Sequence, residues 1–152
     1  MNLPPRTREQ RKRDALERLE RDVDAWVATA DAGSGTPYLV PLSFLWDGDT
    51  LLVSTTATSR TARNLRATGR VRIGVGPTRD LVLIEGTAEA IPDADIPDDV
   101  GDAFAAGTGF DPRREREPYL YFRIRPRRIQ SWREANELDG RELMRDGSWL
   151  DG

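Results

Sequence analysis

The sequence predicts a mainly-β protein in which short antiparallel strands form a closed or nearly closed β-barrel with flanking helices. Six or seven short apolar runs follow residue 23, and several alternate apolar with polar residues, as residues 70–75 do. Turn signals such as Asp47–Gly48 separate neighbouring runs. Only three segments favour helix, and many short strands with few helices are typical of a barrel.

The chain has 152 residues, enough for one domain with a single core. Residues 1–22 are predicted to contain an N-terminal helix packed on the barrel, and residues 23–152 to form the barrel domain. Residues 6–22 contain neither Gly nor Pro and are rich in Arg, Glu, Leu and Ala, which favour helix. Apolar residues such as Ala15 and Leu19 fall near one face, so we expect this helix to pack through a narrow stripe.

The other elements follow in order along the chain. The first three strands are expected to form an antiparallel meander. Thr58 or Ser59 is expected to cap the next helix, and Gly69 to end it. Pro126 marks a break between two strands, and residues 146–147 form a hairpin-like turn. The expected strands are 26–30, 38–46, 50–55, 70–75, 81–91, 119–125 and 128–133, and the expected later helices are 59–68 and 98–106.

Composition excludes several kinds of site. The chain has no Cys and no His, which removes thiol nucleophiles, disulfides and Ser-His-Asp triads, and we predict no metal site. A net charge of −3 argues against a nucleic-acid partner, and no apolar run is long enough to span a membrane. Residues 1–13 are charged and lack a secretory apolar stretch, so we expect a cytoplasmic protein. Trp26 and Trp46 are expected in the core.

The segment from residue 53 to residue 74 is the most informative for function. A strand leads through several hydroxyl residues, Ser59 among them, into a helix that begins with Arg60, Arg63 and Asn64. The first turn of a helix presents free N–H groups and the positive end of its dipole, and guanidinium groups add charge-assisted hydrogen bonds. This pattern predicts an anion site. The alternative is ordinary helix capping beside surface arginines.

The same stretch resembles the split-barrel flavoprotein family typified by pyridoxamine 5′-phosphate oxidase. Ser54 and Thr55 match the hydroxyl pair that ends a strand in the family, and Ser59 and Arg60 match its Ser-Arg helix start, which grips the FMN phosphate. Thr61 stands where the family has Lys, so one phosphate cation is missing. Arg63, one turn further on, is a candidate substitute, and Asn64 continues the match.

A second block near the C-terminus strengthens this resemblance. Arg128, Ile129 and Trp132, followed by Arg141, are similar to the family's C-terminal segment. In the family, the Trp and an Arg about ten residues later contact the flavin. The resemblance therefore implies that Ser54, Thr55, Ser59, Arg60, Arg63, Asn64, Trp132 and Arg141 bind the cofactor.

The departures from the family pattern concern the substrate. The family's oxidase carries Arg-x-His-x-Arg, whose first Arg and His hold the phosphorylated substrate. Here Glu137 and Asp139 occupy those two positions, and like charge disfavours a dianionic substrate. The sequence therefore predicts an oxidoreductase that acts on a small molecule other than pyridoxamine phosphate.

The resemblance implies a split barrel of six to seven strands and a C₂ homodimer with FMN in the groove between subunits. Apolar residues on both faces of strands such as 81–84 also favour a large interface between two copies. Three alternatives stay open. These are the deazaflavin F420 in place of FMN, a non-catalytic flavin- or haem-binding module, and an interaction protein with an empty groove.

Overall fold

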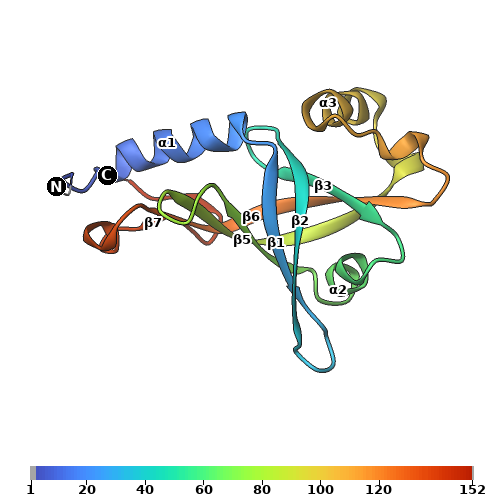
Figure 1. The fold of residues 1–152 in the computed structure, drawn as a ribbon, viewed down its shortest axis with the longest axis horizontal. Helices are drawn as coiled ribbons and strands as arrows, with labels where there is room; N and C mark the ends of the chain where they lie inside the picture. The colour runs from blue at the N-terminus through green and yellow to red at the C-terminus, as the bar shows by residue number, and fades with distance from the viewer. Residues whose placement is uncertain (1–2, 152) are drawn as a thin grey trace.

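The computed structural model describes residues 3–151 and contains an antiparallel barrel extended at one side by two further strands (Figure 1). The sheet order is β3-β2-β1-β4-β5-β6-β7-β8, and β3 also pairs with β6, which closes a barrel of six strands. The main elements are α1 (Arg8–Arg21), β1 (Asp24–Ala30), β2 (Pro37–Trp46), β3 (Leu51–Thr56), α2 (Arg60–Thr68), β4 (Arg70–Val75), β5 (Leu81–Pro92), α3 (Asp98–Thr108), β6 (Tyr119–Trp132), β7 (Glu142–Arg145) and β8 (Ser148–Trp149). The predicted fold class is confirmed.

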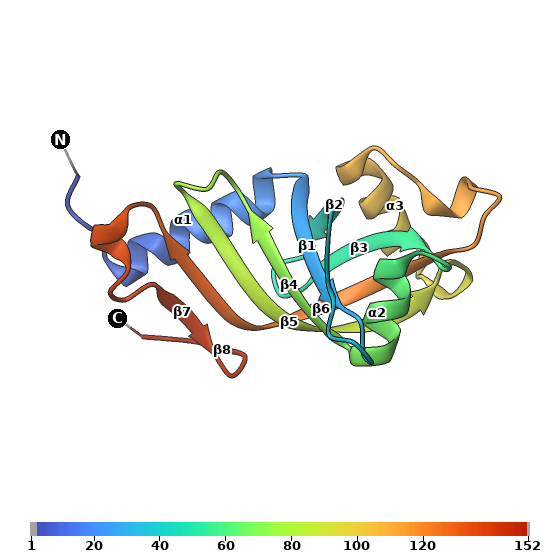
Figure 2. The same ribbon diagram turned by 60° about the horizontal axis from the view of Figure 1, so that its bottom comes forward.

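The N-terminal helix forms as predicted. Thr7 caps α1 by accepting a hydrogen bond from the Gln10 N–H, and the buried stripe includes Ala15 and Leu19. Figure 2 shows α1 beside β7 and β8 at one end of the molecule, with α2 and α3 at the other end. No helix within residues 3–151 is long and apolar enough to cross a membrane.

The predicted meander is also confirmed, because β1 pairs with β2 and β2 with β3, both antiparallel. Pro41 lies where β2 pairs with β1 alone, since the pairing with β3 begins only at Phe44. A proline is tolerated there because one edge of the strand is free. Alternate residues of each strand, such as Val27 and Ile73, fill the barrel core.

The C-terminal strand differs from the prediction. Two strands separated at Pro126 were expected, but β6 is continuous from residue 119 to residue 132 and pairs with β5 along its length. A β-bulge takes up the proline: Gly86 pairs with Pro126, Glu85 pairs with Arg128, and Arg127 has no partner in the register. A Cβ on Gly86 would lie 2.8 Å from the Arg125 carbonyl oxygen, so this close crossing requires glycine.

Two helices cover the other end of the barrel. Ser59 caps α2, and Gly69, with a φ of 65°, ends it as predicted. The third helix lies over the outer face of β2 and β3, where Phe104 packs edge-on against Tyr121 with ring centroids 5.4 Å apart. This small second core lies outside the barrel.

The two tryptophans expected in the core have different environments. Trp46 is buried, as predicted, but Trp26 is 55% exposed, so the prediction for Trp26 is wrong. Trp26 alternates with the inward-facing Ala25 and Val27 and therefore points out of the barrel. An apolar run in a strand does not reveal which of its residues face the interior.

Candidate functional site

The start of α2 is built around the hydroxyl of Ser59. Its Oγ accepts a hydrogen bond from the Ala62 N–H at 3.0 Å and another from Thr55 Oγ1 at 2.9 Å. The end of β3 is therefore tied directly to the helix cap. Because the first N–H groups of a helix have no intrahelical partner, those of Arg60 and Thr61 are available to an external acceptor.

Two arginines lie on one side of this helix start. Arg60 and Arg63 are three residues apart on α2, so they share a face, and both are exposed. Neither guanidinium forms an ion pair with a carboxylate within residues 3–151. The guanidinium of Arg60 lies over the ring of Tyr38, 5.5 Å from its centroid, which holds the side chain close to β2. This geometry supports the predicted anion site.

The next two polar residues of the helix support the fold. Asn64 is buried, and its Nδ2 donates to Thr29 Oγ1 on β1 at 3.1 Å. This hydrogen bond anchors α2 on the barrel. Thr61, which replaces the family's Lys, is also buried, so no side chain at that position offers an exposed cation. Asn64 thus lies in the predicted segment but is occupied with positioning the helix.

A cavity of about 310 Å³ adjoins this helix start, between β2, β3 and α3. Thr55, which bonds to the Ser59 cap, also lines the cavity. The remaining lining is aromatic, aliphatic or hydroxyl-bearing, and includes Ser54, Phe104 and Phe110, with no charged side chain. The Oγ of Ser54 is buried and finds no hydrogen-bond partner within the described chain. A neutral, partly apolar group with one polar edge would satisfy this hydroxyl, and a flavin ring has that chemistry.

The C-terminal pair lies in a separate place. The guanidinium of Arg141 lies over the ring of Trp132, 5.8 Å from its centroid, and its Nη1 donates to the Leu138 carbonyl at 3.1 Å. Both side chains are half-buried. Trp132 and Arg141 therefore form one cation–aromatic unit.

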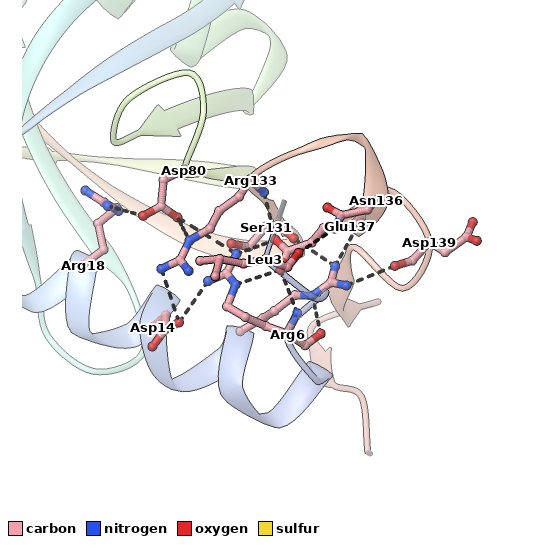
Figure 3. Close-up of polar contacts among 11 residues, drawn as sticks. Leu3, Arg6, Asp14, Arg18, Asp80, Ser131, Arg133, Asn136, Glu137 and Asp139 are labelled. Carbon is pink, nitrogen blue, oxygen red and sulfur yellow. Dashed lines mark hydrogen bonds and ion pairs between the residues drawn. The ribbon is translucent and has the colours of Figure 1, made fainter. Parts of the chain in front are cut away.

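A buried ionic cluster fixes the loop that carries Arg141 (Figure 3). The Glu137 carboxylate accepts hydrogen bonds from the Arg6 backbone N–H at 2.8 Å, from two nitrogens of the Arg6 guanidinium at 2.8 and 3.0 Å, and from the Arg133 backbone N–H at 2.9 Å. These bonds, led by those from the Arg6 side chain, lower the pKa of Glu137 to about 2. The prediction that Glu137 faces the substrate is wrong, because its charge is used inside the fold.

Arg11 of α1 completes this attachment. Its side chain is buried and donates to the carbonyl oxygens of Arg6, Glu137 and Asp139 at 3.1, 2.7 and 3.2 Å. Burial lowers the pKa of Arg11, yet the carbonyls satisfy the guanidinium without a direct carboxylate bond. Sequence reasoning missed Arg6 and Arg11, because nothing local links them to a loop more than a hundred residues away.

The two halves of the predicted cofactor site do not meet within one chain. Ser54 pairs with Tyr121 near the start of β6, whereas Trp132 ends the same strand beside Leu81. Figure 2 shows β5 and β6 running the length of the molecule between these two ends. Within residues 3–151 there is no cluster of three or more potential metal ligands, His, Cys, Asp or Glu.

The class defined by this fold is a split β-barrel in which the second helix begins next to an uncharged cavity. A family model described as pyridoxamine 5′-phosphate oxidase matches residues 12–133. The chain therefore belongs to the pyridoxamine 5′-phosphate oxidase family. No curated protein matches the sequence.

Solved structures share the fold at low sequence identity. One described as an F420 reductase is 22% identical, with a TM-score of 0.62 over 74% of this chain and 93% of that one. A FAD-binding protein from Mesorhizobium loti is 22% identical, with a TM-score of 0.60 over 78% and 89%. The haem storage protein HutZ from Vibrio cholerae is 18% identical, with a TM-score of 0.58 over 76% and 89%. Proteins of this fold thus carry different cofactors.

Proposed function

We propose that this chain is an FMN-dependent oxidoreductase that acts on a small molecule other than pyridoxamine phosphate. The observation that carries the proposal is the junction of two features. One is a helix start with two guanidinium groups that form no ion pair within residues 3–151, and the other is an uncharged cavity with a hydroxyl that has no partner there. FMN has a phosphate for the first and a neutral ring for the second.

Each residue then has a separate task. Arg60, Arg63 and the free N–H groups of α2 hold the phosphate, and Ser59 keeps the helix start rigid through its bonds to Ala62 and Thr55. Ser54 hydrogen-bonds to the polar edge of the ring. The bound flavin supplies the hydride chemistry, while the protein orients it and excludes water. This division explains how a chain without His or Cys can catalyse.

A second copy of the chain completes the proposed site. Trp132 and Arg141 lie at the opposite end of β6 from α2, so they reach a flavin at α2 only from a partner subunit. The outer face of the sheet supports pairing, because Pro41, Trp26, Gly74 and Leu83 form one row across four strands. Trp26 and the nearby Leu39 are 55% and 59% exposed. An exposed apolar row of this kind favours a C₂ interface.

The missing substrate residues support a substrate other than pyridoxamine phosphate. Glu137 is bound to Arg6, and the exposed Asp139 offers no cation. The chain has no His to replace the family's substrate ligand. We therefore expect no turnover of pyridoxine phosphate or pyridoxamine phosphate. Robust turnover of either would show that this part of the chain is aligned wrongly with the family.

F420 is the second candidate cofactor. Its deazaflavin ring is also planar, and one similar structure is described as an F420 reductase. The single cation lost at Thr61 also weakens the specific match to FMN. A haem carrier fits less well, because the chain has neither His nor Cys as an axial ligand.

The deciding experiment adds FMN and F420 separately to the purified protein and records absorbance and fluorescence. Saturable binding of FMN, followed by bleaching with a nicotinamide donor and recovery with an electron acceptor, would support the proposal. If F420 binds and FMN does not, the cofactor is F420 and the FMN assignment is wrong. Flavin that binds but is never reduced would indicate a carrier, and the absence of binding to either would contradict both assignments.

A further inference from the structure

A groove of about 590 Å³ lies outside the proposed flavin site. It crosses the outer face of β1, β4, β5 and β6 and is bounded by the end of α2 and by the β7–β8 hairpin. None of the residues predicted to bind the cofactor lines it. Its apolar part is made of small residues, Ala28 and Ala30 on β1 with Val71 and Gly86.

The groove carries more positive than negative side chains. Five arginines line it against three carboxylates. An ionic ladder neutralises most of them: Arg72 pairs with Glu85 at 2.8 Å, Glu85 with Arg128 at 3.2 Å, Arg128 with Glu142 at 2.9 Å, and Glu142 also with Arg145. The third carboxylate, Asp146, is exposed at the hairpin turn. The ladder makes the floor of the groove rigid, and both of its carboxylates, Glu85 and Glu142, are already paired with arginines.

Two arginines of the groove remain outside this ladder. The guanidinium groups of Arg70 and Arg127 form no ion pair with any carboxylate among the described residues. Arg127 is the unpaired residue of the β6 bulge, and its carbonyl accepts from the Gly147 N–H at 2.8 Å. Gly147 has a φ of 80°, and a Cβ there would lie 2.7 Å from Arg127 Nη1. The hairpin turn therefore makes room for this guanidinium.

We propose that the groove binds a small organic dianion, with its charged group at Arg70 and Arg127 and its apolar part over Ala28 and Ala30. Guanidinium groups bind phosphate and carboxylate oxygens through paired N–H donors, so both a phosphate ester and a dicarboxylate match this chemistry. The groove is concave and lined mostly by polar residues, and its small apolar floor at Ala28 and Ala30 would contact the apolar part of the ligand. This inference does not depend on the flavin assignment.

The test uses calorimetric titration of the full chain with phenyl phosphate and, separately, with succinate, both of which are organic dianions. We expect saturable binding of at least one probe, and the preferred probe identifies the charged group as phosphate or carboxylate. The double variant Arg70→Gln/Arg127→Gln should weaken binding tenfold or more, since each lost charge-assisted bond is worth about a factor of ten. Amide resonances of Gly86 and Thr87 should shift on titration of the unaltered protein.

Two matched variants make the result specific. Arg125→Gln removes an exposed arginine of the same strand that does not line the groove, and should leave binding unchanged. Arg60→Ala should keep the binding event that Arg70→Gln/Arg127→Gln loses, whereas loss of that same event in Arg60→Ala would place the anion at the start of α2 and overturn the proposal. No binding of either probe, or equal weakening by Arg125→Gln, would also overturn it. Sedimentation of the double variant must match the unaltered protein, because dissociation would show that the arginines join two copies.

Discussion

The start of α2 and the Trp132–Arg141 block differ in how far along the chain their supporting contacts reach. Around α2, Ser59 bonds to residues three and four positions away. The block instead depends on α1, whose Arg11 reaches the carbonyls of Glu137 and Asp139, and on Arg6, which binds the Glu137 carboxylate. Local sequence can therefore specify the first region, whereas only the complete fold assembles the second.

Because of this difference, substitutions at α2 can change ligand binding without changing the stability of the fold, whereas substitutions beneath the Trp132–Arg141 block change stability. Arg60 and Arg63 of α2 are exposed and form no ion pair with a carboxylate of the described chain, so they can be removed at little cost to the fold. The arginines that support the block are buried and fully bonded, so their loss affects stability first. The predictions below follow from this contrast.

The largest effect is expected at Glu137. Glu137→Gln leaves the guanidinium of Arg6 without its main buried partner and should lower the free energy of unfolding by about 3 kcal/mol. The matched variant Glu134→Gln removes an exposed partner of Arg79 and should cost far less, because solvent screens this pair. Urea denaturation measures both. Similar losses in the two variants would show that the ionic cluster does not fix the block.

The same residue predicts a pH dependence. The pKa of Glu137 is lowered to about 2 in the fold, below its value of ~4.3 in the unfolded chain. A lowered carboxyl pKa gives stability that is complete above the unfolded value and lost as the pH falls toward 2. We expect the unaltered protein to lose stability between about pH 5 and pH 2, and Glu137→Gln to lose distinctly less over that range. Parallel pH profiles would contradict this assignment.

At α2 the effect should be on phosphate binding. Arg60→Ala removes one charge-assisted bond worth roughly 1.5–3 kcal/mol, so FMN affinity should fall about ten- to a hundredfold. Riboflavin, which lacks the phosphate, should lose almost nothing, and the fold should keep its stability. Flavin-fluorescence titration with both ligands measures this difference. Equal losses for the two flavins would mean that Arg60 acts through the structure instead of through phosphate.

The exposed face of β1 should matter to assembly. Trp26→Ser should weaken association between copies by about 2 kcal/mol, a magnitude usual for a buried aromatic residue at an interface. Since Trp26 is 55% exposed in one chain, the stability of the separate subunit should hardly change. Sedimentation over a concentration series compares the variant with the unaltered protein. A monomer in both would contradict the proposed dimer and the shared site.

The smallest effect is expected at Ser54. Its hydroxyl has no partner within the described chain, so Ser54→Ala should leave stability unchanged or slightly raised. Flavin affinity should fall about fivefold, by the ~1 kcal/mol of one neutral hydrogen bond. Denaturation and flavin titration of the same preparation test both statements. Unchanged affinity would remove Ser54 from the predicted site.

The comparison of the two regions also marks the limit of sequence analysis. Capping residues and Gly69 predicted α2 to within one residue, because helix ends depend on neighbours a few positions away. Pro126 was misread as a break, because a bulge opposite Gly86 accommodates it and that pairing is not local. Glu137 was misread as a substrate-facing charge, because its partner Arg6 lies at the other end of the chain. An alignment shows that a charged residue such as Glu137 occupies a position, but it does not show whether another side chain already neutralises that charge.

The central claim is that α2 of one copy and the Trp132–Arg141 block of its partner form one flavin site. Mixing an Arg60→Ala chain with an Arg141→Ala chain tests it most directly. In the mixed dimer, one site carries both defects and the other carries neither, so about one site in four should bind FMN with unaltered affinity after random exchange. Each variant alone should show no such sites. If the mixture binds FMN no better than the two separate variants, both halves act within one chain and the account is contradicted.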